Sequence, residues 1–370
     1  MPATLHVKSG ALVSHRLLDV ANEIDLAHAE TLWISHPGHQ SRRTQLSTAG
    51  TNELAFGVPP ALLVMPSMDI ELGGEPMRAE MTARLYDFGA IVIAVRIPVS
   101  GLSWGDFSQR FNELDRATAN EAPIWRDALR MVLDIIGPAL HRPLAKHLEE
   151  DYLFAIVHAF AEPMTAAQIR EQAHVPTLLS GEARPLSSQQ AAAITEQAFS
   201  YFEDDLVVVT WDRAFLYEPR RDSDVVDIIE VANAQLLEMR YYDELLDEEL
   251  AAMYDLVANA RGGLSLLASR RAARLARRLY GLVAEVTELT ERVENSLQVT
   301  EDVYLARVYG AALELFRVPR LSEAVDRKLA IIRDTYTALY DEASSRRAEL
   351  LELAIVLLIV FEIVLALFKP

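Results

Sequence analysis

The stretch LYDFGAIVIAVRIPV, residues 85–99, decides the fold of the first half of the chain. It is rich in Ile and Val, whose branched side chains favour the extended backbone of a β-strand. A second run of this kind, DYLFAIVHAF, occupies residues 151–160. Farther on, Leu206–Trp211 and Ala214–Tyr217 flank a polar Asp-Arg pair, which predicts a β-hairpin. These strands predict a mixed α+β domain, which we place at residues 81–220.

Helix-start signals lie close to these strand runs. Ser103, Thr165 and Ser187 are each followed three residues later by Asp or Gln. With this spacing, the two side chains satisfy free backbone amides at the start of a helix. A unit of strand, loop and capped helix therefore occurs at least twice. We expect antiparallel strands with helices packed on one face of the sheet.

The first 80 residues give weaker signals. Short apolar runs at Thr31–Ile34 and Ala61–Met65 are separated by Gly, Pro, Ser and Thr, and residues 35–50 read as a polar loop. We therefore predict an irregular N-terminal region with short strands at residues 1–80. The first thirty residues include acids and no apolar run, so no signal peptide is predicted.

The second half of the chain is almost continuously helical. Apolar residues recur at alternating spacings of four and three in residues 225–257, 268–293 and 325–343. A 3.5-residue repeat over such lengths predicts helices packed in a left-handed coil. Pro319 suits the start of the last helix. We predict a three-helix coiled-coil stalk at residues 221–348.

The C-terminal segment Leu350–Phe368, LLELAIVLLIVFEIVLALF, is apolar at seventeen of nineteen positions. As a helix it would rise about 28 Å, close to the ~30 Å hydrocarbon core of a bilayer. Arg346 and Arg347 precede it, which by the positive-inside rule keeps the body of the protein in the cytoplasm. We predict a single-pass transmembrane anchor at residues 349–370, in the cell inner membrane. The alternative is a helix buried within a soluble oligomer.

One acid, Glu362, lies well inside this segment. One interpretation is that its carboxyl is protonated or extends toward the membrane surface. The other is that it contacts another copy of the chain, because ionisable residues in membranes usually face a bundle interior. We expect a homo-oligomer held by the stalk and the span together.

The composition limits the chemistry. The formal net charge of −19 makes nucleic acid an unfavourable main partner, because phosphate binding requires a basic surface. The chain contains no cysteine, which excludes disulfides, thiolate nucleophiles and zinc–thiolate sites. No Gly-rich phosphate loop is present. We predict neither a cofactor nor a metal.

Three acids near the predicted hairpin are the main catalytic candidates. Asp204, Asp205 and Asp212 lie around one strand, and paired carboxylates can hold a divalent metal. Acids in turns need no function, however. The enzyme alternative is a carboxylate-dependent activity on phosphate esters.

Polar residues crowd one part of the first long helix, at Glu230, Asn233, Glu238, Arg240 and Asp243. Asp243 occupies a core position of the heptad repeat, where a polar side chain commonly fixes the register of packing. We expect this helix to pack against the α+β domain through hydrogen-bonded pairs. A ligand site or active site here is the alternative.

A basic helix follows this acidic one. Residues 261–278 include six Arg and no acid, and Arg270, Arg274 and Arg277 line one helical face. Because residues 222–255 include eleven acids, we predict that the two helices pair. The alternative is binding of RNA or the ribosome through the Arg270–Arg278 patch.

Four segments resemble a known family. IIEVANAQLLEMRYYDELLD, Ile228–Asp247, resembles the central signature of the required-for-meiotic-nuclear-division family, a domain-of-unknown-function family of bacteria, yeasts and mitochondria. Leu85–Ile93 and Asp204–Tyr217 resemble its strand signatures, and Leu351–Leu365 resembles its membrane segment. The resemblance implies an inner-membrane anchor, a homo-oligomer and, from the mitochondrial members, tethering of ribosomes. It implies no catalytic residue.

These observations favour a membrane-anchored, homo-oligomeric scaffold or tether without its own catalysis, linked to translation or cell division. Its expected partners are the lipid bilayer, other copies of the chain, and a protein or ribosome.

Overall fold

The computed structural model describes residues 5–43, 58–182, 184–221, 224–260 and 303–367, together with single positions between 274 and 287. The chain divides into two compact units. The globular unit comprises Met1–Tyr241 and Arg292–Pro319, and the helical unit comprises Tyr242–Glu291 and Arg320–Pro370. The predicted mixed α+β class is confirmed.

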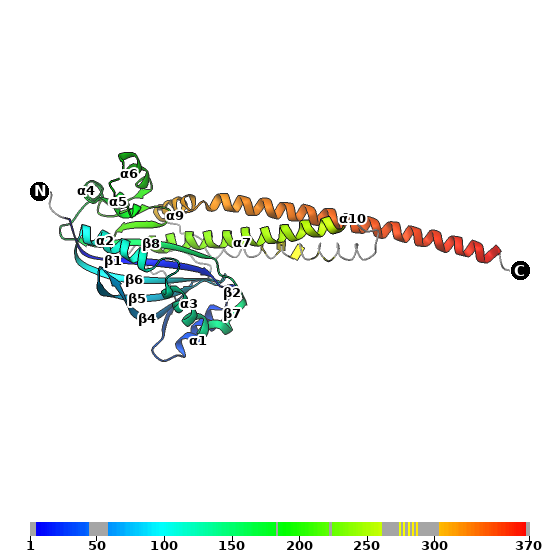
Figure 1. Ribbon diagram of the computed structural model, residues 1–370, viewed down its shortest axis with the longest axis horizontal. Coiled ribbons are helices and arrows are strands. Elements are labelled where there is room, and N and C mark those ends of the chain that lie inside the picture. Colours follow the sequence, from blue (N-terminus) through cyan, green and yellow to red (C-terminus); the bar gives the residue numbers. More distant parts are fainter. Residues whose placement is uncertain are drawn as a thin grey trace. The chain divides into compact units, whose positions relative to one another are not determined.

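A nine-stranded sheet forms the centre of the globular unit, in the order β3-β4-β5-β6-β1-β8-β11-β10-β9 (Figure 1). Paired strands are antiparallel, except that β8 and β11 run parallel. A separate two-stranded sheet pairs β2 with β7. The strands are β1 (His6–Asp19), β2 (Ala21–Ile24), β3 (Gln40–Arg43), β4 (Ala61–Leu72), β5 (Glu75–Leu85), β6 (Ala90–Ser103), β7 (Leu140–Pro143), β8 (Glu149–Phe160), β9 (Ala198–Phe199), β10 (Leu206–Val209) and β11 (Arg213–Tyr217).

Three helices begin where the sequence predicts. The side chains of Ser103, Thr165 and Ser187 each accept a hydrogen bond from the backbone N–H three residues later, which caps α2, α4 and α6. The hairpin of β10 and β11 is also confirmed. The helices are α1 (Leu26–Ile34), α2 (Trp104–Ala117), α3 (Pro123–Ile136), α4 (Ala166–Gln172), α5 (Val175–Ser180), α6 (Ser188–Ile194), α7 (Val225–Ala260), α9 (Val303–Leu315) and α10 (Val318–Leu367), with a 3-10 turn at Gly137–Ala139.

The prediction of an irregular region at residues 1–80 is wrong. β1 is fourteen residues long and lies at the centre of the large sheet, between β6 and β8. Its residues from Gly10 to Asp19 are all buried, including Ser14, His15 and Arg16. A strand covered on both faces does not show the alternation of polar and apolar residues that marks a half-exposed strand.

The run at residues 85–99 is divided between two strands rather than one. β5 ends at Leu85, and β6 begins at Ala90. Gly89 lies in the turn with a φ of 106°. A Cβ at this position would overlap the carbonyl oxygen of Ala21, so only glycine fits both the backbone angle and the space.

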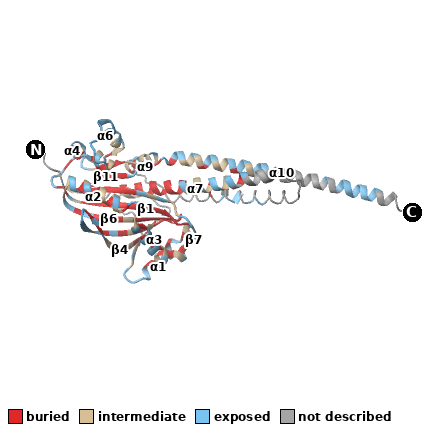
Figure 2. Cartoon of the chain, in the orientation of Figure 1, coloured by how far each residue is buried: buried red, intermediate tan, exposed pale blue. Residues whose placement is uncertain are grey.

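Helices cover both faces of the sheet, not one face as predicted. On one face, Phe107 of α2 and Val132 of α3 belong to the main hydrophobic core. On the other face, Ala234 and Leu237 of α7 pack in a second core with Val92 of β6. The first half of α7 is therefore buried on nearly all sides (Figure 2).

Within the helical unit, α7 and α10 are joined by a charged cluster. Lys328 Nζ lies 2.6 Å from Asp243 Oδ1 and 2.7 Å from Asp247 Oδ1. The buried apolar side chains of this unit include Leu246, Met253, Val325 and Ile332, all four in the predicted apolar repeats. The repeat at 268–293 lies largely outside the described residues, so the three-helix stalk stays a prediction.

The predicted transmembrane anchor at 349–370 is not supported. Among the residues that the structure describes, no helix combines the length and the apolar character needed to cross a bilayer.

Candidate functional site

A pocket lies on the face of the sheet that α7 covers, beside the first turns of that helix. Its volume is about 360 Å³, at the lower end of the range for ligand-binding cavities. The strands contribute an apolar floor that includes Val13, Val92, Ala94 and Ile156. Polar side chains surround this floor: His15, Glu80, Thr82, Arg84, Arg96, His158, Glu218, Arg221, Asp227 and Glu230. We call this cavity the sheet pocket.

Glu230 is the centre of a buried polar cluster in the sheet pocket. Its Oε1 accepts hydrogen bonds from the Tyr86 hydroxyl at 2.6 Å and from Arg84 Nη1 at 3.0 Å. The same Arg84 nitrogen donates to Asp227 Oδ1 at 2.6 Å. The two acids lie three residues apart on α7, so they share one helical face. Two carboxylates thus share one guanidinium, which leaves one negative charge uncompensated when both are ionised.

His15 of β1 completes this cluster. Its Nδ1 lies 3.4 Å from Glu230 Oε2 and has no hydrogen-bond partner among the described residues. The ring also makes an edge contact with Phe154. Burial, and then the nearby Arg84, lowers the pKa of His15 to about 3, so the imidazole is neutral at physiological pH. Nδ1 is therefore the ring nitrogen that a ligand beside Glu230 can reach.

Burial shifts the other groups of the cluster as well. It raises the pKa of Glu230, and the charge of Arg84 opposes this effect. Burial, together with the negative charge of Glu230, holds the pKa of Tyr86 well above its usual value. Tyr86 therefore stays a hydrogen-bond donor, and a cation bound beside Glu230 would favour the ionised carboxylate.

Arg96, Glu80 and His158 of the sheet pocket are held less firmly. Arg96 Nε lies 3.8 Å from Glu80 Oε2, and the two side chains are 42% and 59% exposed. Arg96 faces Val13 across β6 and β1, two residues from His15 along β1. His158 Nδ1 lies 3.3 Å from a backbone carbonyl oxygen, and burial lowers the pKa of His158.

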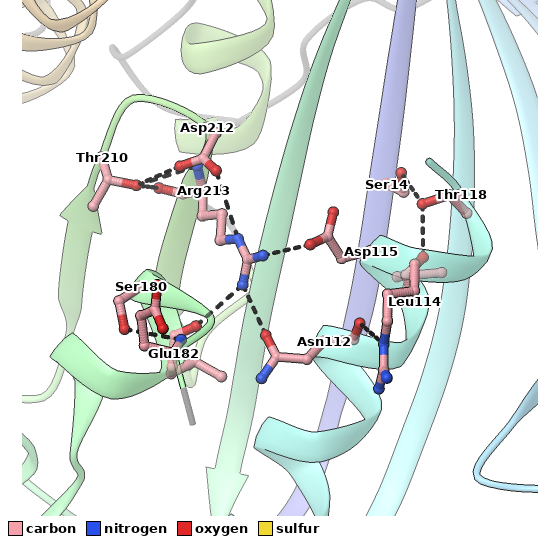
Figure 3. Close-up of polar contacts among 12 residues, drawn as sticks. Ser14, Asn112, Leu114, Asp115, Thr118, Ser180, Glu182, Thr210, Asp212 and Arg213 are labelled. Carbon is pink, nitrogen blue, oxygen red and sulfur yellow. Dashed lines mark hydrogen bonds and ion pairs between the residues drawn. The ribbon is translucent and has the colours of Figure 1, made fainter. Parts of the chain in front are cut away.

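A second buried polar cluster ties β11 to the helices on the opposite face of the sheet (Figure 3). Arg213 donates to Asp115 Oδ2 at 2.5 Å and to Asn112 Oδ1 at 2.8 Å, both on α2. The guanidinium also lies over the ring of Phe111. Gly181, just after α5, has a φ of +66°, and a Cβ there would lie 2.8 Å from the guanidinium nitrogens. This cluster stabilises the fold, because Arg213 of β11 forms its hydrogen bonds with residues of neighbouring elements.

The three carboxylates proposed as catalytic candidates are not brought together. Asp205 caps a turn, since its carboxylate accepts from the backbone N–H groups of Tyr201 and Phe202. Asp204 is its exposed neighbour, whereas Asp212 follows the other end of β10. Four residues of strand separate these ends by about 13 Å. The described residues include no group of three potential metal-ligating side chains.

The polar residues of α7 have different surroundings. Besides Glu230, Asn233 donates to a backbone carbonyl of β8 at 3.5 Å, and Arg240 pairs with a β8 glutamate. Glu238 is buried, with 3% of its surface exposed. Asp243 belongs to the helical unit and contacts Lys328. The expected hydrogen-bonded packing against the strands is thus present at the first positions, and the pocket lies beside Glu230.

Two arginines of the basic patch and the acid of the last helix are exposed. Arg270 lies outside the described residues. Arg274 and Arg277 are exposed, and no ion pair to either is found in the part of the chain that the structure describes, so their pairing with acidic residues stays a prediction. Glu362 is exposed on α10.

Comparison with known proteins assigns the chain to a family. The family model described as "Uncharacterized protein MJ0711, N-terminal domain" matches residues 9–224, more than half of the chain. The chain belongs to the MJ0711 N-terminal domain family. The uncharacterized protein MJ0711 of Methanocaldococcus jannaschii is 27% identical over 222 residues, which cover 60% of this chain and 66%, just under two thirds, of that protein. No solved structure matches the chain.

The MJ0711 N-terminal domain family is without an assigned function, so it supplies no catalytic residue. The comparisons do not support the resemblance to the required-for-meiotic-nuclear-division family, which stays a prediction. The MJ0711-type match spans the strands that form the floor of the sheet pocket and stops just before α7 begins.

Sequence reasoning identified Glu230 but missed its partners His15, Arg84 and Tyr86. The available signal was the string SHR, Ser14–Arg16, within an otherwise apolar stretch of β1. Polar residues inside an apolar strand are usually hydrogen-bonded or functional, so this string marks the site. Arg84 and Tyr86 were hidden because their partner lies more than 140 positions away along the chain.

Proposed function

We propose that the protein is a homo-oligomeric scaffold without its own catalysis, in which the end of α10 joins copies of the chain. The observation that carries this proposal is the exposure of the apolar stretch at Ile355–Phe361. Its seven side chains are consecutive, and each is 51–64% exposed (Figure 2). A contiguous exposed apolar surface of this kind is typical of an interaction site.

Consecutive helical residues point in all directions around the axis, so a single flanking helix would leave part of this stretch uncovered. Several copies of the same helix would cover it, and most soluble oligomers are symmetric assemblies of identical chains. Glu362 would then face equivalent acids of its neighbours, and protonation of one carboxyl would allow a shared hydrogen bond. This proposal leaves the globular unit free to present its surface to a protein or ribosome partner.

The enzyme alternative has lost its structural motivation, because β10 separates Asp212 from Asp204 and Asp205. The scaffold is therefore the function to test first.

The test is the molar mass of the full chain, measured by light scattering at micromolar concentration. The double substitution Ile355→Asp and Leu358→Asp places charge in the apolar stretch and is expected to dissociate the oligomer. Ile331→Asp is the matched control, since Ile331 is an exposed apolar residue of α10 outside the stretch. This control should keep the parental mass.

A monomeric parent protein would overturn the proposal. A parent chain that is monomeric and floats with phospholipid vesicles would assign the apolar stretch to a bilayer instead of to other copies. An oligomer that survives the double substitution would place the interface elsewhere and equally refute the role of α10.

A further inference from the structure

We propose that the sheet pocket binds a small aliphatic zwitterion of amino-acid size, with its amino group beside His15 and Glu230 and its carboxylate at Arg96. This inference rests on the globular unit alone and does not depend on the scaffold proposal.

The amino-group end is defined by charge. With His15 neutral, Arg84 is the only positively charged side chain paired with Asp227 and Glu230 among the described residues, so the ionised cluster has one negative charge in excess. The Glu230 side chain is 3% exposed, and a negative charge in excess at such a buried place is costly unless a further counter-charge approaches. A ligand ammonium group supplies that charge.

His15 adds a hydrogen-bond acceptor at the same end. Its imidazole is neutral, and its Nδ1 faces Glu230 at 3.4 Å. When Nε2 carries the proton, Nδ1 presents a lone pair beside Glu230, because one nitrogen of a neutral imidazole is a donor and the other an acceptor. An ammonium group has three N–H donors, which suit both Nδ1 and the Glu230 carboxylate.

The carboxylate end is defined by Arg96. This residue lies opposite Val13, which is two positions from His15 along β1, or about 7 Å at the rise of a strand. The contact of Arg96 with Glu80 is long, at 3.8 Å, and largely exposed. Such pairs contribute little, so the guanidinium is available for a ligand carboxylate, which it can bind through two parallel hydrogen bonds.

The apolar floor of the sheet pocket determines which chemical group of the ligand fits between its amino group and its carboxylate. Val13, Val92, Ala94 and Ile156 offer a surface without hydrogen-bonding side chains. An aliphatic side chain would bury its apolar area there, at a gain of about 25 cal/mol for each Å². A polar ligand body would instead lose hydrogen bonds with water.

The experiment is isothermal titration calorimetry on the full chain with three probes of matched shape. L-leucine has both charges, isoamylamine lacks the carboxylate, and 4-methylpentanoic acid lacks the amino group. L-leucine is expected to bind about ten-fold or more tightly than either analogue, since each analogue loses a charged hydrogen-bonded contact.

Two variants assign the binding to this pocket. Arg96→Gln changes a half-exposed residue, so the protein should fold, and its affinity for L-leucine should fall to the level of isoamylamine. Arg78→Gln is the control, because Arg78 is also an exposed arginine with a loose acidic partner, but lies outside the pocket. This variant should bind L-leucine as the parent does.

Three results would overturn the inference. One is the absence of L-leucine binding at millimolar concentration. Another is equal affinity for L-leucine and one of the analogues, which would show that the pocket does not recognise the charged group missing from that analogue. The last is unchanged affinity in Arg96→Gln, which would show that the ligand binds elsewhere.

Discussion

The hydroxyl of Tyr86 provides a direct test of the buried cluster around Glu230. In the structure this hydroxyl donates to Glu230 Oε1 at 2.6 Å, and the whole Tyr86 residue is 2% exposed. Tyr86→Phe keeps the ring and removes only the donor. A hydrogen bond to a charged group contributes ~1.5–3 kcal/mol, so the free energy of unfolding should fall by about that amount. For a unit of this size the melting temperature should fall by roughly 3–12 °C.

The assay is urea-induced and thermal unfolding at pH 7, followed by circular dichroism. Tyr201→Phe is the matched control, because Tyr201 is 59% exposed and its change should have little effect. In a Glu230→Gln background the acceptor is neutral, so Tyr86→Phe should cost less than in the parent. If Tyr86→Phe and Tyr201→Phe have the same melting temperature, the Glu230 carboxylate does not depend on the Tyr86 hydroxyl and the description of the cluster is wrong.

Three further predictions concern two titrating groups, a glycine and an ion pair. Burial raises the pKa of Asp19 from 3.8 to about 7, so this acid stabilises the fold at low pH and its contribution is lost as the pH rises toward 7. The pKa of His15 is lowered from 6.5 to about 3, so its contribution is present above pH 6.5 and is lost as the pH falls. Between pH 4 and 6.5, the stability of Asp19→Asn relative to the parent should therefore rise with pH, whereas the relative stability of His15→Gln should fall. Each change should be at most ~1.4 kcal/mol per pH unit, measured by urea titrations. Slopes of the same sign for the two variants would refute this assignment. Gly181→Ala should lower the melting temperature more than Gly74→Ala, because both glycines have positive φ but only Gly181 has the Arg213 guanidinium against it; equal effects would show that the arginine moves aside at no cost. Lys328→Gln should destabilise the helical unit by ~1 kcal/mol in the same urea assay, since two α7 aspartates lose their shared partner. An unchanged free energy of unfolding would mean that apolar packing alone holds α7 against α10.

The sequence permitted prediction wherever the deciding contact is local. The caps at Ser103, Thr165 and Ser187 satisfy amides only three residues away, so their spacing alone locates the helix starts. The β10–β11 hairpin is also local, and its polar turn is visible in the sequence. Polar residues of α7 could likewise be recognised as an anomaly, although their partners could not.

Features that depend on distant partners could not be predicted. β1 looks irregular because helices cover both of its faces, and the sequence of one strand does not reveal what covers it. The sheet pocket needs five strands and α7 at once, so Arg84 has no local signature, and the string Ser14–Arg16 marks His15 without revealing its partners. The membrane anchor at 349–370 stays a prediction for another reason: hydropathy measures composition, and a self-associating helix and a spanning helix share the same apolar composition.

The central place of β1 has a consequence for synthesis on the ribosome. Leu12 pairs with Ala155, which is translated 143 residues later. At 5–20 residues per second, the nascent strand waits roughly 7–29 s before its second neighbour exists. During that time an apolar strand has an unpaired edge that other nascent chains can join. The demand for a chaperone should therefore be greatest before β8 emerges and should end once β1 is enclosed.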